Sequence, residues 1–318
     1  MKKILALIIS AVMLMSLLAA CGEEATTQET TEQNQPEETT AAPEDTQVNE
    51  PENQETVYLL ASAERTPLAC GGDRRMNTMD YDANGNLITR TSEEYDYTYS
   101  YDNENRMTGW KRLRGDGSVH ENRIYQYGDN GKVSSWSYQM GEYMFAFENT
   151  YDQQENLIKV VCTRNGEYYS EETYTYDASG RVTEYKGSDH LQYTYEDNKV
   201  TVAIVMNNGK QYTDSIREYD ESGNLIYEET YDEGELYTKD AYTYDADGKL
   251  VSSTNWSSYN AGEHRMEYTY DENGCLVEVN VKEGLGILYR LTYTYVRWQG
   301  DAQRAEQLRS TPIDEFWQ

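Results

Sequence analysis

The chain has 318 residues, and 57 Asp and Glu against 27 Lys and Arg give it a formal net charge of -30 at pH 7. This acidity argues against nucleic acid and against an anionic membrane surface as direct partners of the folded part, because their phosphates would be repelled. The chain also holds 31 Tyr but only 3 Phe, and tyrosine, with its apolar ring and polar hydroxyl, suits half-buried β-sheets.

The N-terminus has the three parts of an export signal. Residues 1–3 (MKK) are positively charged, residues 4–18 are apolar, and LAAC at residues 18–21 places small side chains before a cysteine. The LAAC segment resembles the lipobox of bacterial lipoproteins. This resemblance implies that residues 1–20 are a signal peptide and that Cys21 carries the lipid that anchors the protein to a membrane. The alternative is an ordinary secretory signal with an incidental cysteine.

Residues 21–56 are predicted to be a disordered acidic linker that follows the lipidated cysteine. After Cys21 this segment contains no aromatic residue, and Val48 is its one aliphatic side chain larger than alanine. Such a segment cannot bury enough apolar surface to offset the entropy lost on ordering, and its acidic side chains repel one another. We therefore expect a tether that holds the folded domain on the extracytoplasmic face of the cell membrane.

The folded domain, predicted over residues 57–298, consists of a repeat of about 25 residues. Its motif reads Tyr-Asp, two variable residues, Gly, a polar residue and an aliphatic residue, as in YDESGNL at residues 219–225. Seven of the nine spacings between successive motifs lie within one residue of 25, which chance does not produce. The motif tyrosines are Tyr81, Tyr101, Tyr127, Tyr151, Tyr176, Tyr195, Tyr219, Tyr244, Tyr270 and Tyr295.

Each motif is predicted to be a turn between two antiparallel strands. Asp177 opens one such turn, where its carboxylate can accept hydrogen bonds from backbone N–H groups, and Gly180 supplies the positive φ. A second turn signal, such as the Asn-Gly pair at residues 208–209, lies halfway through each repeat. The alternative for these aspartates is weak calcium binding, although residues 245–248 lack the remaining ligands of an EF-hand loop.

Two strands and two turns in each repeat predict an all-β fold, a continuous antiparallel meander of about ten two-stranded units. Tyrosines two residues apart point to the same face of a strand, and sheets of this size curl. We therefore expect an open spiral with rows of tyrosines on its inner, concave side. Residues 58–60 and the tail after residue 296 are expected to cap the end strands, and residues 299–308 are predicted to form a short helix within the C-terminal segment 299–318.

The repeat Tyr-x-Tyr-Asp-x-x-Gly-(Arg/Asn/Lys)-Leu resembles the RHS/YD repeats of bacterial surface and toxin proteins and of the teneurins. The resemblance covers residues 75–298 and implies a spiral antiparallel sheet. Large members of that family enclose a toxin, but this chain has about ten repeats and shows no autoproteolytic cap, so encapsulation is not carried over. The chain is more similar to short, lipid-anchored YD-repeat proteins.

No pattern of catalytic or cofactor-binding residues is recognisable. The sequence lacks the GxSxG, HExxH, P-loop and GxGxxG motifs, and its acidic pairs are too numerous for one to be selected. We therefore predict no enzymatic activity, no cofactor and no metal site. The three histidines, each in a polar context, are His120, His190 and His264.

The remaining cysteines give no further constraint on the fold. Once Cys21 is lipidated, Cys70, Cys162 and Cys275 are left, without CxxC spacing. One disulfide bond and one free thiol are compatible with this number outside the cell, but the sequence does not specify which residues pair.

Binding is therefore the predicted function. We expect a lipid-anchored, non-enzymatic scaffold or binding module at the cell surface, whose partners are the membrane, through Cys21, and a glycan or surface protein. The alternative is a carbohydrate- or cell-wall-binding lipoprotein that uses exposed rows of Tyr and Trp. Two further alternatives are a remnant of an RHS-type toxin-delivery system and a glycan hydrolase. The tryptophans considered for binding are Trp110, Trp136, Trp256 and Trp298.

Overall fold

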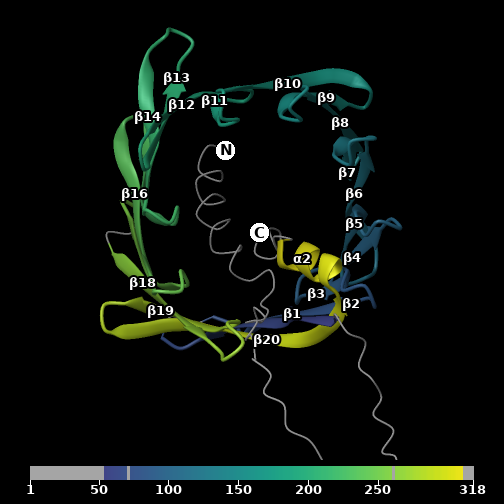
Figure 1. The fold of residues 1–318 in the computed structure, drawn as a ribbon, viewed down its shortest axis with the longest axis vertical. Helices are drawn as coiled ribbons and strands as arrows, with labels where there is room; N and C mark the ends of the chain where they lie inside the picture. Colours follow the sequence, from purple (N-terminus) through teal and green to yellow (C-terminus); the bar gives the residue numbers. More distant parts are fainter. Residues whose placement is uncertain (1–53, 70–71, 260–261, 311–318) are drawn as a thin grey trace, which may run out of the picture.

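The computed structural model describes residues 54–69, 72–259 and 262–310 (Figure 1). The predicted signal peptide, Cys21, most of the linker, Cys70 and the last residues of the chain lie outside this part. Its elements are twenty strands and one short helix, α2 (Ala302–Ser310). The strands are β1 (Gln54–Pro67), β2 (Arg75–Tyr81), β3 (Leu87–Thr91), β4 (Asp96–Tyr101), β5 (Met107–Leu113), β6 (Val119–Tyr127), β7 (Val133–Met140), β8 (Tyr143–Tyr151), β9 (Leu157–Arg164), β10 (Glu167–Tyr176), β11 (Val182–Lys186), β12 (His190–Glu196), β13 (Lys199–Val205), β14 (Gln211–Tyr219), β15 (Leu225–Asp232), β16 (Glu235–Tyr244), β17 (Leu250–Ser257), β18 (Glu263–Tyr270), β19 (Leu276–Glu283) and β20 (Gly286–Asp301).

The twenty strands form one closed antiparallel barrel. Each strand pairs with the next along the chain, and β1 also pairs with β20, from Gln54 opposite Asp301 to Pro67 opposite Tyr289. Figure 1 shows the resulting ring of strands. The meander is as predicted, but the expectation of an open spiral is wrong, because the first and last strands meet.

The segment that closes the barrel is the one that carries no repeat motif. Residues 58–60 were expected to cap an open edge, yet they belong to a full strand of 14 residues. Leu60 and Ala63 on this strand are fully buried, and they join Val279 and Tyr293 in the largest core cluster. A bulge after Leu60 adjusts the pairing with β20. Closure satisfies the backbone groups that two free edges would leave unpaired.

The helix α2 packs beside the seam between β1 and β20, within the outline of the ring in Figure 1. Arg304 donates a hydrogen bond to Asn86 Oδ1 at 2.6 Å, which ties the helix to the first Tyr-Asp turn. Because β20 continues to Asp301, the helix starts later than the predicted range 299–308. No helix among the described residues is long and apolar enough to span a membrane. The buried side chains of this contact are Val57, Leu59, Ala305 and Leu308.

Where the motif carries an aspartate, this residue holds the turn together. Asp177 Oδ1 accepts hydrogen bonds from the backbone N–H groups of Ser179 and Arg181, at 2.9 and 3.0 Å, and Oδ2 accepts one from Arg181 Nε at 2.7 Å. These bonds, first of all the one from the Arg181 backbone, lower the pKa of Asp177. The same pair of backbone bonds is present at Asp82, Asp102, Asp152, Asp220, Asp245 and Asp271.

A tyrosine hydroxyl donates a hydrogen bond beyond the point where the backbone hydrogen bonds between two paired strands stop. The ladder between β15 and β16 ends at the pair Tyr227 and Ala241. Beyond it, the Tyr244 hydroxyl donates to the Leu225 carbonyl at 2.9 Å, which gives this carbonyl a partner. Eight other pairs make the same bond, at 2.7–2.9 Å: Tyr81–Leu60, Tyr101–Leu87, Tyr127–Met107, Tyr151–Val133, Tyr176–Leu157, Tyr195–Val182, Tyr270–Leu250 and Tyr295–Leu276.

Tyr219 is the exception in the series, and the turn before it explains why. The motif at residues 195–200 is one residue shorter than the others, so Glu196 pairs directly with Lys199 around a tight turn. The ladder between β13 and β14 then continues as far as Lys199 opposite Glu218. Because backbone bonds persist to the end of these strands, a tyrosine bond is not required there.

Replacing Tyr270 with Phe should lower the free energy of unfolding by about 1 kcal/mol, because the Leu250 carbonyl loses its partner. Burial raises the pKa of Tyr270 to about 12. The stabilisation by this hydroxyl is therefore complete below about pH 10, the ordinary tyrosine pKa, and is lost as the pH rises to about 12. Denaturant unfolding of the full-length protein in detergent measures the difference, with Tyr168→Phe as the control at an exposed hydroxyl. Equal losses in the two variants would contradict a specific role of the tyrosine bond.

Candidate binding site

The two ends of the barrel differ in their turns. Seven of the nine turns that follow the even-numbered strands β2 to β18 carry the Tyr-Asp pair, while Gly128 and Glu196 stand in place of the aspartate after β6 and β12. We call this end the YD rim. The turns that follow odd-numbered strands are the second turns of each repeat, and we call this end the hairpin rim. Because Gln54 pairs with Asp301, β1 begins and β20 ends at the YD rim.

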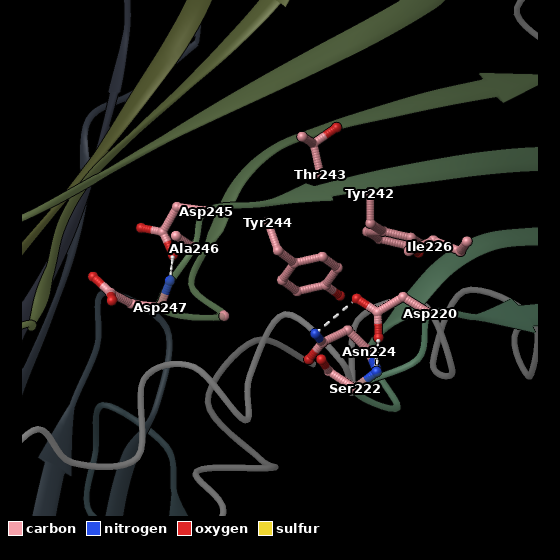
Figure 2. A pocket seen from close by; sticks show the side chains of 11 residues that line it. Asp220, Ser222, Asn224, Ile226, Tyr242, Thr243, Tyr244, Asp245, Ala246 and Asp247 are labelled. Atoms are coloured by element: carbon pink, nitrogen blue, oxygen red, sulfur yellow. Dashed lines mark hydrogen bonds between the residues drawn. The ribbon is translucent and has the colours of Figure 1, made fainter.

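A groove of 540 Å³ lies at the YD rim between two consecutive turns. Figure 2 shows the Tyr244 ring between the turn of Asp220 and the turn of Asp245. The polar groups of this groove are largely used within the protein: the Tyr244 hydroxyl bonds to Leu225, and both Asp220 oxygens bond to the turn, including Asn224 Nδ2 at 2.9 Å. No three His, Cys, Asp or Glu residues in the described part are grouped to hold a metal ion.

The hairpin rim, in contrast, exposes large apolar side chains. They occur at the tips of seven of its ten hairpins. Their exposed fractions range from 42% for Tyr143 to 106% for Leu285. We call this set the apolar crown; its members are Leu68, Val119, Met140, Tyr143, Met144, Tyr168, Tyr169, Met206, Tyr259 and Leu285. Five of these residues (Met140, Tyr143, Met144, Tyr168 and Tyr169) lie on two adjacent hairpins, and clustered exposure of this kind is typical of a contact surface.

Aromatic rings gather where the crown meets β7, β8, β9 and β10. Phe147 stacks on Trp136 with 3.8 Å between ring centroids, and Phe145 stacks on Tyr138 at 4.9 Å. Tyr169 meets Phe145 edge to face at 5.7 Å. We call these five residues, together with Tyr143 at the edge, the aromatic platform.

Arg164 lies between two exposed rings of the platform. Its guanidinium carbon is 5.5 Å from the centroid of Tyr143 and 4.9 Å from that of Tyr169. Glu167 is directly opposite Arg164 across the strand pair β9–β10. Both side chains are exposed, and in the described part Arg164 forms no ion pair. A cationic donor and an anionic acceptor are thus adjacent without neutralising each other.

The structure separates the four tryptophans that the sequence suggested for binding. Trp136 belongs to the platform, whereas Trp110 is buried and its Nε1 has no hydrogen-bond partner among the described residues. Trp256 is half-buried in β17, and Trp298 packs against the α2 cluster. The exposed rings are instead tyrosines at hairpin tips, which sequence reasoning missed. Their signal is an aromatic residue soon after a glycine turn, as in MGEYM and NGEYY.

The histidines and cysteines are not brought together in the described part. His120, on β6, stacks on Tyr95 at 5.3 Å, and His190, on β12, contacts Glu184 at 2.7 Å. His264 lies on β18. Cys162 is a buried free thiol, and Cys275 is disulfide-bonded.

A row of buried charges crosses β14, β15, β16 and β17. Arg217 Nε donates to Glu228 Oε1 at 2.7 Å, and Asn255 Nδ2 donates to Asp240 Oδ1 at 2.7 Å. Glu228 and Asp240 face each other across the strand pair β15–β16 and are 2% and 4% exposed. Asp240 Oδ2 has no hydrogen-bond partner. Burial raises the pKa of Asp240 to about 6; the Asn255 bond opposes this rise, and the Glu228 charge adds to it.

Comparisons with known proteins give distant likenesses. A family model described as "Uncharacterised protein" matches residues 188–285. No curated protein matches the chain. Similar solved structures include the TcdB2-TccC3-Cdc42 complex (12% identity, TM-score 0.23), where the match covers 77% of this chain and 19% of that one. They also include a Tc holotoxin pore of Photorhabdus luminescens (13% identity, TM-score 0.28, 74% and 16% covered) and a porin-like protein of Bacteroides uniformis (9%, 0.33, 74% and 98%).

The chain therefore spans about a fifth of the length of the first of these toxin chains. The family model covers less than a third of the present chain. At these TM-scores, none of the likenesses assigns an activity to the protein.

Replacing Asp240 with Asn should stabilise the protein at pH 7. Because the folded-state pKa of Asp240 is raised to about 6, its contribution to stability falls as the pH rises from about 4 to about 6. The asparagine keeps the acceptor for Asn255 and removes the buried charge, so the free energy of unfolding at pH 7 should rise by about 1–3 kcal/mol. Thermal unfolding at pH 4 and pH 7 measures the effect.

The matched control for this prediction is Asp232→Asn, at an exposed position on the neighbouring strand β15. This control should change the unfolding temperature little at either pH. A destabilised Asp240→Asn variant at pH 7, or an equal gain in the control, would show that the unpartnered carboxylate is not the cause.

Proposed function

We propose that this protein is a lipid-anchored, extracytoplasmic binding module without enzymatic activity, and that the hairpin rim is its binding face. The apolar crown is the observation that carries this proposal. Large apolar side chains at the tips of seven hairpins cost solubility, and no turn of the YD rim exposes such a side chain among the described residues. A contact surface explains this difference between the two ends.

The anchor is the second part of the proposal. A diacylated Cys21 and the linker over residues 21–56 would hold the barrel at a membrane. The start of β1 at the YD rim supports this arrangement, because a tether that joins there leaves the hairpin rim as the free end. A full-length protein that takes up no labelled palmitate, or takes it up unchanged after Cys21→Ser, would contradict this part.

The repeat identification remains part of the same proposal. The tyrosine bonds recur around the barrel with one exception, at Tyr219, and seven of the nine turns after β2 to β18 carry Tyr-Asp, which supports repeats of the RHS/YD type. Binding needs a rigid frame, and a closed ring of short hairpins gives each tip a fixed position. The acidic net charge of -30 disfavours an anionic lipid surface as the ligand of the hairpin rim.

A triple variant at three separate tips tests the binding face. Val119, Met206 and Leu285, which are 51%, 42% and 106% exposed, are each replaced by Ser, which removes the large apolar side chain from each of those tips. The full-length protein in detergent is passed over a panel of immobilised cell-wall polysaccharides and extracellular proteins. We expect retention on its ligand to fall at least tenfold, because several apolar contacts are lost at once.

The matched control replaces Ile88, Ile124 and Val296 by Ser. These side chains are also exposed and apolar, but they lie away from the hairpin tips. The control should bind like the native protein. Retention that is lost in the control and kept in the crown variant would place the binding face elsewhere.

A further inference from the structure

We propose that the aromatic platform binds a neutral glycan, with one pyranose ring on Tyr169 and Tyr143 and its hydroxyl groups on Arg164 and Glu167. This inference rests on the hairpin rim as the binding face and names the class of ligand that this part of the rim takes. Four observations lead to it: the exposed rings, the position of Arg164, its unpaired neighbour Glu167, and a bulge that places Tyr169.

The rings have the character that sugar binding requires. Tyr143 is 42% exposed and Tyr169 is 53% exposed, so ring surface is open to a ligand, and the Tyr169 ring is supported by its edge-to-face contact with Phe145. A pyranose presents C–H groups on one face and hydroxyls around its edge. The C–H face of the sugar packs on an aromatic ring, and the hydroxyl groups at the edge of the sugar need hydrogen-bond partners.

Arg164 and Glu167 provide those partners. The guanidinium has several fixed N–H donors and no acceptor, and the carboxylate has acceptors only. A pair of neighbouring sugar hydroxyls can accept from the first and donate to the second. The contacts of Arg164 with the two tyrosine rings hold its plane in place, so little side-chain entropy is lost on binding.

The β-bulge is the feature that puts Tyr169 on the platform. In the pairing of β9 with β10, Tyr168 lies opposite Thr163 and Ser170 lies opposite Cys162, so Tyr169 is the extra residue. Its ring contacts Phe145. Bulges of this kind redirect a side chain next to a site. Tyr168 is 69% exposed but pairs with Thr163, one residue from Arg164, and therefore points to the other face of the sheet.

The charge of the site and of the whole chain favours a neutral glycan over an acidic one. Arg164 and Glu167 together carry no net charge, and the chain as a whole carries -30. A uronic-acid or sulphated polymer would be repelled over a length of about 8–10 Å at moderate ionic strength. A neutral sugar meets no such repulsion, and the tyrosine rings keep their stacking surface at any ionic strength.

The experiment measures binding of the full-length protein in detergent to neutral oligosaccharides of glucose, galactose, mannose and N-acetylglucosamine. Uronic-acid and sulphated oligosaccharides form the second arm, and both arms are repeated at low and high salt. We expect at least one neutral series to bind with an affinity that changes less than twofold with salt. The acidic series should bind at least tenfold more weakly than that neutral series.

Single variants then locate the sugar. Tyr169→Ala should weaken neutral-glycan binding at least tenfold, while Tyr169→Phe keeps it within threefold because the ring remains. Arg164→Gln and Glu167→Gln should each weaken it about fivefold or more. Ile124→Ala is the matched control: it removes an exposed apolar side chain that lies away from the hairpin tips and should leave the affinity within twofold of native, with an unchanged circular dichroism spectrum.

The outcomes separate this inference from the proposed function. If no neutral glycan binds, or if Ile124→Ala loses as much affinity as Tyr169→Ala, the glycan site is overturned. Preferred binding of acidic chains with a steep loss in salt also overturns it. If the glycan site fails while the crown variant still loses retention on a protein of the panel, the hairpin rim stands as a binding face for a protein. If both fail, the proposed function fails as well.

Discussion

The pairing of β1 with β20 is the constraint on which the rest of the structure depends. It joins residues more than 220 positions apart in the sequence along the full length of β1. By closing the sheet, it removes both free edges, builds the largest core cluster around Leu60 and Val279, and defines two rims. Only a closed ring has two distinct rims, so the contrast between the internally bonded turns of the YD rim and the exposed side chains of the hairpin rim depends on closure.

The repeat itself could be predicted from the sequence, because its chemistry is local. Asp177 bonds to residues two and four positions later, and Gly180 has the positive φ that the turn requires. The motif tyrosines were recognised in the sequence, but the hydrogen bond of their hydroxyl group was not predicted. Tyr244 donates to a carbonyl 19 positions earlier, on the neighbouring strand. This hydrogen bond is needed only because the strands separate near the turn and leave the carbonyl without a backbone partner. The shortened motif at residues 195–200, where the ladder continues and the bond is absent, supports this explanation.

Closure could not be predicted, because β1 contains no Tyr-Asp motif to mark it as part of the sheet. Its residues 58–60 were interpreted as an end cap, and the local sequence does not specify which distant strand an edge strand will pair with. For the candidate site, the sequence offered exposed rows of Tyr and Trp as an alternative, but it could not specify which rings are exposed. In the structure Trp110 is buried, whereas Tyr169 is exposed at a β-bulge that no sequence pattern marks.

The most direct test of the account is a cross-link across the seam. The Ser62 hydroxyl on β1 lies 2.6 Å from the Thr294 hydroxyl on β20, so cysteines at both positions should form a disulfide bond within one molecule. Intact-mass and peptide mapping of the oxidised full-length protein, with each single cysteine variant as the control, would detect it. A closed barrel predicts near-complete intramolecular linkage of the double variant at high dilution. Free thiols at both positions under the same oxidising conditions would mean that the two strands do not meet, and the barrel would have to be abandoned.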